Sequence, residues 1–372
     1  MTGDVLLCSS GLFLPEHELT NAELVQSFNA YVDSVHGATA DGAYADERAI
    51  VKATGVKSRR VVDKDGVLDT RRMRPRLQPR PDSALSLQAE LAVHAARQAL
   101  EQAELRPGQL GLIVVGSTSL ERAYPAVAIE VQHALGVPGY AFDLSAACSS
   151  ATFALQVAAQ AIACGNVGAA LVISPELPTA QVNFRDPQTH FIFGDGAAAV
   201  VLCKQDWRPP SAAFRILGLD AETRFSNSIR NDFGFLNRCT EPGDDDARLL
   251  FRQNGVRVMR DLVPMASQHI LRHLKKLSIA PKDVARLWLH QANVHLNRLV
   301  CERVLGEWAD DAKAPSVLAD CGNLASAGSI AAFHRFHRDL PPGAIGVLCS
   351  FGAGYSVGSI VLQRLEQMAM SR

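Results

Sequence analysis

The sequence predicts an α/β fold made of two halves related by a pseudo-twofold axis. Apolar strand-like runs alternate with amphipathic helical segments, and the second half repeats the order of the first. One repeated unit is a strand, a polar turn and a helix ending in Leu-Gly, predicted at residues 108–136 and again at 282–306. A second repeated unit is a strand, a glycine turn and a strand, predicted at 168–202 and again at 345–365. We expect a mostly parallel sheet in each half, with right-handed crossovers.

We place the boundary between the halves near Trp207–Ser211, so that residues 1–206 form one half and 207–372 the other. A chain of 372 residues, 48% hydrophobic and 20% charged, is typical of a globular protein with a large core. A net charge of −1 gives no general attraction to nucleic acid or to an anionic membrane, and we expect neither partner.

The eight cysteines are scattered, without a C-x-x-C pair, which argues against a metal site or a redox motif. The chain begins with Asp4 where an export signal carries basic residues, so we expect a cytoplasmic protein with reduced thiols. The most apolar run, 150–174, contains Gln156 and Asn166, which favours a buried helix and strand over a membrane span.

The first quarter of the chain predicts a strand, a helix and a long irregular segment. Residues 4–14 predict the strand, and Thr20 with Glu23 forms a capping box that begins the helix. Residues 36–85 are polar and irregular, and 69–82 within them are basic and rich in proline. Two hypotheses remain for this basic piece: a solvated surface loop, or a phosphate-binding site.

Helical periodicity returns at 86–101 and is followed by a buried strand at 110–116 and a helix at 125–135. Residues 169–174 predict another buried strand. Residues 191–202 predict a further strand, with a turn or bulge at Gly194-Asp195-Gly196 in its middle.

The rest of the chain is organised around residues 141–164, which predict a strand, a turn of small residues, Cys148 and a long helix. A thiol at a helix N-terminus lies at the positive end of the helix dipole, which favours the nucleophilic thiolate. The alternative is that Cys148 is a small buried apolar residue in an alanine-rich helix. This segment alone does not decide between them.

Two further polar residues follow predicted strands or turns in the second half. His290 comes directly after the strand Leu287-Trp288-Leu289, and Asn323 lies in a turn of small residues at 321–329. Each has an ordinary alternative, since His290 suits a structural histidine and Asn323 suits turn formation. Because the chemistry of such sheets gathers at the carboxyl ends of their strands, we expect both residues to lie near Cys148.

These three residue types together suit one reaction. A cysteine accepts an acyl group as a thioester, and a decarboxylating malonyl thioester supplies the carbanion that extends it. The enolate oxygen then needs two neutral donors, which His290 and Asn323 provide. A second oxyanion hole, for the acylated cysteine, needs backbone N–H groups, and we assign it to Cys148 and Ala353.

Five segments together resemble the signature segments of the β-ketoacyl-acyl-carrier-protein synthase III family of the thiolase superfamily. They are DLSAACSSATFAL, IFGDGAAAVVL, WLHQAN, CGNLASAGSI and SFGAGYSVGS, in the family's order and spread over the chain. The resemblance implies the five-layered αβαβα thiolase-like fold, a Cys148–His290–Asn323 triad, a homodimer, and no metal or cofactor.

The resemblance also assigns residues around the substrates. It implies that Tyr124 reaches the acyl pocket of the partner subunit. The further substrate-binding candidates are Asn293, Phe193, Gly352, Arg185 and Arg59. It implies docking of the acyl carrier protein on basic residues along an arginine-rich helix, for which the candidates are Arg248, Arg252, Arg257 and Arg260.

The chain departs from the family where coenzyme A is bound. The tryptophan and arginine that sandwich the adenine in well-known members align with Ala49 and Ala53, and a further arginine aligns with Pro187. Lys52, Arg59 or Arg60 are candidates to compensate, and Arg185 lies close by. The long 60–85 segment is similar to a longer subgroup that starts fatty-acid chains from acetyl-CoA or medium-chain acyl-CoA.

The expected function is therefore to load an acyl group from acyl-CoA, acetyl to medium-chain, on Cys148 and join it to malonyl-acyl-carrier protein in fatty-acid biosynthesis. Two alternatives remain: acyl transfer to a hydroxyl or amine in secondary metabolism, and a catalytically silent subunit. Asn323 favours condensation, because simple acyl transfer stabilises no enolate. Cys148 argues against a silent subunit.

Overall fold

A computed structural model describes residues 5–36, 44–207, 214–234 and 246–366. Its centre is a nine-stranded sheet in the order β11-β12-β13-β8-β1-β7-β6-β4-β5. The two halves of this sheet are joined only through β1 (Val5–Phe13) and β8 (Phe214–Ser226), which pair at Leu6–Arg215 and Leu7–Phe214. The expected boundary at 207–211 lies largely outside the described residues.

The first half of the sheet contains β1, β4 (Leu112–Gly116), β5 (Tyr140–Leu144), β6 (Ala169–Glu176) and β7 (Gly196–Lys204). The second half contains β8, β11 (Val284–Leu289), β12 (Ile345–Gly352) and β13 (Gly354–Arg364). The glycine-rich segment predicted as a strand at 191–202 becomes regular only at Gly196. Before that, residues 192–194 pair with the chain around Asn323.

The expectation of a mostly parallel sheet is wrong, because the sheet is mixed. Among the strands that the structure describes, the parallel pairs are β4–β5, β4–β6 and β11–β12. The pairs β6–β7, β1–β7, β12–β13 and β8–β13 are antiparallel. A tight glycine turn at 352–354 joins β12 to β13, and a connection that short can only reverse the chain.

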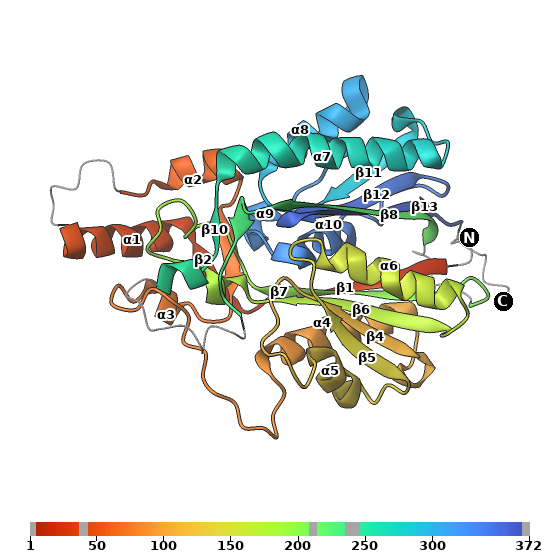
Figure 1. Cartoon of the computed structure of the whole chain (residues 1–372), viewed down its shortest axis with the longest axis horizontal. Coiled ribbons are helices and arrows are strands. Elements are labelled where there is room, and N and C mark those ends of the chain that lie inside the picture. Colours follow the sequence, from red (N-terminus) through yellow and green to blue (C-terminus); the bar gives the residue numbers. More distant parts are fainter. Residues whose placement is uncertain (1–4, 37–43, 208–213, 235–245, 367–372) are drawn as a thin grey trace.

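Five layers alternate helix and sheet, which confirms the αβαβα fold (Figure 1). Helices α4 (Leu87–Ala103) and α5 (Val127–Leu135) cover the outer face of the first half-sheet. Helices α6 (Ser150–Ala163) and α10 (Gly328–Arg335) pack between the two half-sheets. The outer face of the second half-sheet is covered by α7 and α8, whose bounds are Gly255–Lys276 and Val294–Leu305.

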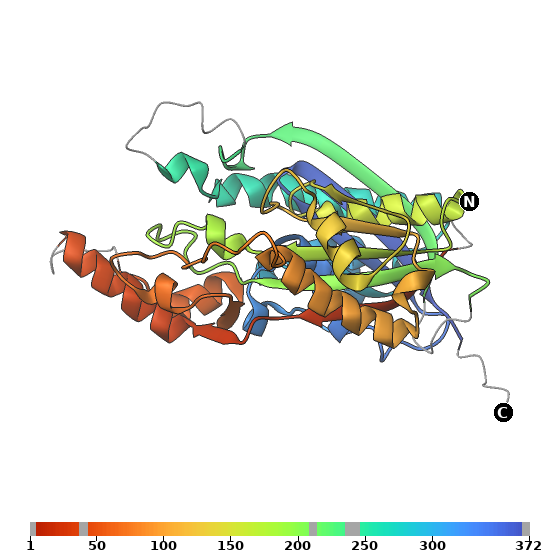
Figure 2. The ribbon, with the colours of Figure 1, turned by 90° about the horizontal axis from the view of Figure 1, so that it is seen from below.

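A smaller unit projects from one end of the layers, as the turned view in Figure 2 shows. It contains β2 (His17–Thr20), α1 (Asn21–His36) and β3 (Ser58–Val61), around a cluster of apolar side chains. The predicted capping box is confirmed, because the Thr20 N–H donates to Glu23 Oε2 at 3.0 Å and the Glu23 N–H to Thr20 Oγ1 at 3.3 Å.

The segment expected to be irregular contains short elements besides β3, namely α2 (Glu47–Thr54) and α3 (Asp65–Leu68). Periodicity missed α2 because only Ile50 and Thr54 of its residues are buried. Its ends are fixed locally instead, by the Asp46 side chain accepting from the Ala49 N–H and by Gly55 at φ +83°.

Two further expectations concern the cysteines and membranes. Cys8 of β1 and Cys203 of β7 form a disulfide, so the expectation that every thiol is reduced is wrong for this pair, which neighbouring strands bring together. Within the described residues, the structure contains no helix long and apolar enough to cross a membrane.

Candidate active site

Cys148 stands at a sharp turn between β5 and α6. The residue before it, Ala147, has φ +49°, in the left-handed region that residues with a Cβ rarely adopt. Ser150 holds this turn: its hydroxyl accepts from the Ala146 N–H at 2.8 Å and donates to the carbonyls of Ala147 and Ser117. The turn therefore needs the small residues that the sequence supplies.

The chain opposite Cys148 approaches it so closely that only glycine fits. A Cβ on Gly352 would lie 2.6 Å from Cys148 Cβ and 3.0 Å from its sulfur. The next residue, Ala353, directs its backbone N–H at the Cys148 sulfur, as does the N–H of Cys148 itself. This is the pair of N–H groups assigned to the oxyanion hole.

The expected thiolate is wrong for the resting enzyme. Burial raises the pKa of the Cys148 thiol to about 12, and the charge of Glu176 adds to that effect, while the two backbone N–H groups only partly oppose it. Desolvation of the sulfur raises the pKa of the thiol by more than the positive end of the helix dipole lowers it. The thiol is therefore protonated at neutral pH and needs a base when it attacks.

His290 follows β11 and is buried. Its backbone N–H donates to the Cys349 carbonyl at 2.8 Å, which fixes it beside β12. Its ring meets Phe351 edge to face, with centroids 5.6 Å apart. Burial lowers the pKa of His290 to about 4, so the imidazole is neutral at physiological pH. Its Nδ1 atom has no hydrogen-bond partner among the described residues.

Asn323 is held by its backbone and by one atom of its side chain. Its N–H donates to the Ile192 carbonyl at 2.9 Å, and its carbonyl accepts from the Gly194 N–H at 3.2 Å. The side-chain Oδ1 accepts from the Ala325 N–H at 2.9 Å. The turn chemistry expected as the ordinary alternative thus occupies the oxygen and leaves the Nδ2 amide as the donor for a substrate.

Cys148, His290 and Asn323 all line one cavity of about 130 Å³. Phe193, Gly352 and Asn293, three of the substrate-binding candidates, line it as well. Asn293 also has a structural task, because its side chain caps α8 and donates to the Ala53 carbonyl at 2.6 Å. Much of the remaining wall is apolar and comes from Ile192, Ile229, Phe251, Val258, Met259, Leu262, Leu296 and Phe351.

The burial of Arg59 argues against its expected role in substrate binding. The side chain is fully buried, and its guanidinium donates to Asn21 Oδ1 and to the carbonyls of Leu19 and Phe191. Because this side chain is buried and its two terminal nitrogens are bonded inside the molecule, it is not presented to a bound acyl-CoA. It instead ties β3 to the segment that leads into the Asn323 contact.

The docking candidates are exposed but do not all lie on one helix. Arg257 and Arg260 are in the first turns of α7, whereas Arg248 belongs to a 3-10 turn (Asp246–Leu249) and Arg252 to β10 (Arg252–Gln253). Arg252 pairs with Asp232 at 2.9 Å, and Arg257 and Arg260 share Asp261. Tyr124 lies on the loop between β4 and α5 and is 85% exposed.

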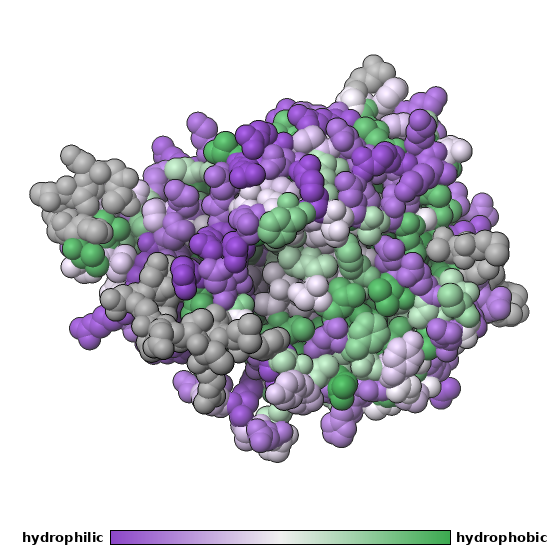
Figure 3. All heavy atoms as spheres, in the orientation of Figure 1, coloured by the Kyte–Doolittle hydropathy of each residue, from purple (hydrophilic) through white to green (hydrophobic). Residues whose placement is uncertain are grey.

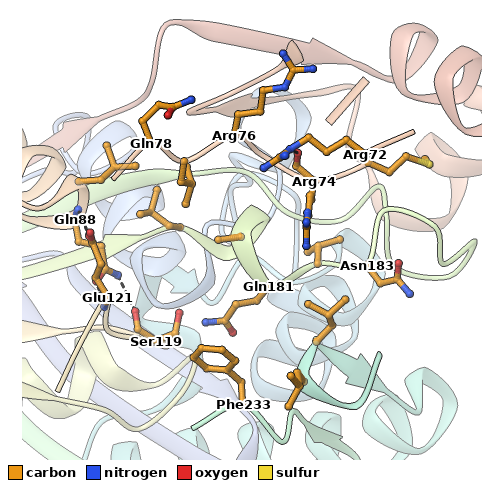
Figure 4. Close-up of a pocket in the computed structure, with 18 of the residues that line it drawn as sticks. Arg72, Arg74, Arg76, Gln78, Gln88, Ser119, Glu121, Gln181, Asn183 and Phe233 are labelled. Atoms are coloured by element: carbon orange, nitrogen blue, oxygen red, sulfur yellow. Dashed lines mark hydrogen bonds between the residues drawn. The ribbon is translucent and has the colours of Figure 1, made fainter. Parts of the chain in front are cut away.

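A second, larger cavity of about 1210 Å³ lies apart from the three catalytic candidates, none of which lines it (Figure 4). The basic segment 69–80 forms one wall, and Arg185 belongs to this cavity too. Several of its arginines are satisfied within the chain: Arg76 pairs with Asp69, Arg80 with Glu90, and Arg72 donates to two carbonyls. Figure 4 shows Ser119, Gln181 and Phe233 across the hollow from Arg74.

Glu176, the last residue of β6, is a further residue near the site that the sequence did not predict. It is fully buried, and burial raises its pKa to about 7. The available signal was an acidic residue directly at the carboxyl end of an otherwise apolar strand. Within the described part of the chain, no group of three or more His, Cys, Asp or Glu side chains is placed to hold a metal ion.

Comparisons with known proteins identify the family of the chain. The family described as 3-oxoacyl-[acyl-carrier-protein (ACP)] synthase III matches residues 142–222, and its C-terminal counterpart matches 274–364. The beta-ketodecanoyl-[acyl-carrier-protein] synthase of Pseudomonas aeruginosa is 44% identical over 349 residues, covering 91% of this chain and 100% of the relative. The beta-ketoacyl-[acyl-carrier-protein] synthase III of Methylococcus capsulatus is 29% identical, covering 96% and 98%.

Among solved structures, the 3-oxoacyl-[acyl-carrier-protein] synthase III of Aquifex aeolicus superposes with a TM-score of 0.77 at 24% identity, covering 96% of this chain and 99% of that one. The fold and the sequence matches together define a condensing enzyme of the acyltransferase class. The chain belongs to the 3-oxoacyl-[acyl-carrier-protein] synthase III family.

Proposed function

We propose that this enzyme joins a medium-chain acyl primer of about eight carbons, supplied as acyl-CoA, to malonyl-acyl-carrier protein with loss of CO2. The observation that carries the proposal is that Cys148, His290 and Asn323 line one largely apolar cavity. The primer length comes from the Pseudomonas aeruginosa relative, which is named for a ten-carbon β-keto product. Two of those carbons come from malonate in such a condensation.

Loading begins with a protonated Cys148. As its sulfur attacks the acyl-CoA carbonyl, the proton passes to His290, whose low pKa keeps it neutral and ready to accept. The carbonyl oxygen becomes negative and binds the backbone N–H groups of Cys148 and Ala353. Collapse of this intermediate expels coenzyme A, whose sulfur takes the proton back from His290, and leaves the acyl group on Cys148 beside a neutral imidazole.

Condensation uses the same cavity from its other side. The malonyl thioester loses CO2, and its enolate oxygen binds the imidazole N–H of His290 and the Nδ2 of Asn323. Both donors are uncharged, as is required to stabilise the enolate without protonating its carbon prematurely. The carbanion then attacks the acyl-Cys148 carbonyl, the carbon–sulfur bond breaks as the β-ketoacyl product forms, and the released thiolate takes up a proton from water. These steps involve no metal or cofactor.

The apolar wall supports a primer longer than acetate. Phe193 and Phe251 line the cavity and meet edge to face, with centroids 4.9 Å apart. Leu262, Leu296 and Val258 contribute aliphatic surface to the same lining. Burying each methylene of an alkyl chain against such a wall contributes about 0.8 kcal/mol, so an eight-carbon chain is favoured strongly over two.

The carrier protein is proposed to dock at the N-terminal end of α7. Gln253, Gly255 and Met259 line the cavity, so its rim lies where Arg252, Arg257 and Arg260 are exposed. Among the described residues, these three arginines pair with Asp232 and Asp261, so three positive charges meet two negative ones, which suits an acidic partner.

A homodimer is also proposed. Strand β5 ends the central sheet, and Tyr124, Ile129 and Tyr140 around it are 85%, 47% and 46% exposed. Figure 3 shows apolar side chains gathered over this part of the molecule, where β4, β5 and α6 lie. A second copy pairing at β5 would cover these side chains and bring its Tyr124 toward this subunit. The proposed location is the cytoplasm.

The test is a panel of acyl-CoA primers from two to ten carbons, given with malonyl-acyl-carrier protein and scored for CO2 and β-ketoacyl product by mass spectrometry. The proposal expects the highest kcat/KM near eight carbons. Transfer of the acyl group to a hydroxyl or amine without CO2 would identify the alternative acyltransferase. Absence of acylation at Cys148 with every primer would identify a silent subunit.

A further inference from the structure

A buried carboxylate lies behind the nucleophile and has no part in the mechanism above. Glu176 Oε1 accepts from the Thr118 N–H at 2.8 Å, from the Ser326 N–H at 3.3 Å and from the Ser326 hydroxyl. Its other oxygen, Oε2, is buried and has no hydrogen-bond partner among the described residues. Hydrogen bonds therefore hold Oε1 of Glu176 in place, while Oε2 can accept a hydrogen bond from a further group.

Thr118 offers a second available atom at the same place. Its side chain lies close enough to Glu176 to lower the pKa of that carboxyl, yet its Oγ1 is buried without a hydrogen bond of good geometry. Two such neighbouring atoms need a further hydrogen-bonding group, and a water molecule is the one that most often satisfies buried polar atoms of this kind.

This position adjoins Cys148. The charge of Glu176 lies near enough to the Cys148 sulfur to raise the pKa of that thiol. The strand end that carries Thr118 packs on the nucleophile turn, because the Thr118 carbonyl accepts from Ser145 Oγ at 3.4 Å and the Ser117 carbonyl from Ser150 Oγ at 3.0 Å. Ser326, on the far side of Glu176, is three residues from Asn323.

We propose that Glu176 and Thr118 hold a water molecule that hydrolyses the acyl group from Cys148 when no malonyl-carrier protein arrives. Glu176 Oε2 takes a proton from this water, and the oxygen attacks the thioester carbonyl. The carbon–sulfur bond breaks, the sulfur receives the proton from Glu176, and a free carboxylic acid leaves. The enzyme thereby clears primers that cannot be extended. The inference rests on the acyl-Cys148 intermediate of the proposed function.

Glu176 has the strength that this task needs. Burial brings its pKa to about 7, where a carboxylate is both substantially ionised at neutral pH and a far better base than an exposed one. Thr118 orients the water and does not exchange protons. Neither residue is required to touch the malonyl group, so hydrolysis and condensation use different partners around the same thioester.

The experiment loads the full-length enzyme with octanoyl-CoA, removes excess donor and follows loss of the octanoyl adduct by intact mass, without malonyl-carrier protein. Wild type, Glu176→Gln, Thr118→Val and Thr118→Ser are compared, with Glu101→Gln on the exposed face of α4 as the matched control. We expect Glu176→Gln to slow discharge by about 100-fold and Thr118→Val by about tenfold, with Thr118→Ser and Glu101→Gln near wild type.

The outcomes separate the two proposals. If no adduct forms on Cys148 of the wild type, the proposed function fails and the inference fails with it. If the adduct forms but is lost at the same rate from Thr118→Val and Glu176→Gln as from wild type, only the inference is overturned. Should Glu176→Gln not fold, the difference between Thr118→Val and Thr118→Ser still decides.

Discussion

The two halves of this enzyme share an architecture but supply different chemistry to the site. The first half contributes Cys148, a nucleophile that forms a covalent bond, and the second contributes His290 and Asn323, which exchange a proton or donate hydrogen bonds but form no covalent bond with the substrate. Each half has an alanine at positive φ beside its reactive group: Ala147 at +49° before Cys148, and Ala325 at +46° after Asn323. Local strain positions the group on both sides.

The two halves differ in the direction in which burial shifts the pKa of the reactive group. The first half raises the pKa of its thiol by burial, so Cys148 stays protonated until a substrate arrives. The second half lowers the pKa of its imidazole by the same physical cause, so His290 stays neutral. Burial in one cavity thus keeps both groups uncharged at rest. Separate substitutions should therefore remove acylation of Cys148 and condensation with the malonyl group.

The largest effect is expected from Cys148→Ala. Without the sulfur no thioester can form, so acyl transfer from octanoyl-CoA should fall to background. Intact mass after incubation with the donor measures this directly. An adduct of equal yield on the variant would place the acyl acceptor elsewhere.

Asn323→Ala should spare capture and remove condensation. Loss of one oxyanion donor lowers a rate by about 100- to 1000-fold, and this donor serves only the enolate. Single-turnover measurements of loading and of CO2 release would give the two rates. If both fell equally, the division of labour between the halves would be wrong.

Gly352→Ala tests the contact between the halves. Its Cβ would collide with Cys148, so we expect slower loading by about tenfold and a loss of about 1–3 kcal/mol in unfolding free energy. Gly108→Ala is the matched control, because a Cβ there meets nothing within 4 Å. Thermal unfolding and loading rates are measured on both. An unchanged loading rate in Gly352→Ala would show that the backbone around residue 352 shifts enough to accommodate the added Cβ.

A smaller effect is expected at the rim of the second half. Replacing Arg257 and Arg260 together by Ala should raise the KM for malonyl-carrier protein by about three- to tenfold and reduce its dependence on salt, with loading from acyl-CoA as the comparison. Arg298→Ala, which removes an exposed arginine of α8 paired with Glu302, is the control. Equal effects of both changes would argue against docking at α7.

The smallest effect concerns pH. Because the folded enzyme holds the pKa of His290 near 4, the condensation rate of preloaded enzyme should change little from pH 7 to 5 and decline only as pH approaches 4. A histidine at its ordinary pKa of about 6.5 would instead lose activity through pH 6. Rapid-quench assays across this range distinguish the two profiles.

Much of the site was predictable because its residues follow strand ends. Cys148, His290 and Asn323 come directly after apolar strands or in turns of small residues, and such patterns are local in the sequence. What depends on contacts between distant segments was not predictable. The burial of Arg59, the protonated state of Cys148 and the pairing of Cys8 with Cys203 each arise from residues far apart in the chain.

The same reasoning explains the error in the sheet. Strand and helix periodicity identified most elements, but it does not give the direction of β7 and β13 relative to their neighbours, which depends on the path of the connection before each strand. Glu176 was missed because one acidic residue at the end of an apolar strand resembles an ordinary strand terminus. Its surroundings, Thr118 and Ser326, come from two distant loops.

The most direct measurement is a peptide map of the octanoyl-loaded enzyme, taken before and after malonyl-carrier protein is added, for wild type and Asn323→Ala. An octanoyl group on the Cys148 peptide of both proteins is expected first. After addition it should disappear from the wild type as a ten-carbon β-ketoacyl product forms, and remain on Asn323→Ala. An octanoyl group on any other residue, or a β-keto product formed without acylation of Cys148, would contradict the division of chemistry between the two halves.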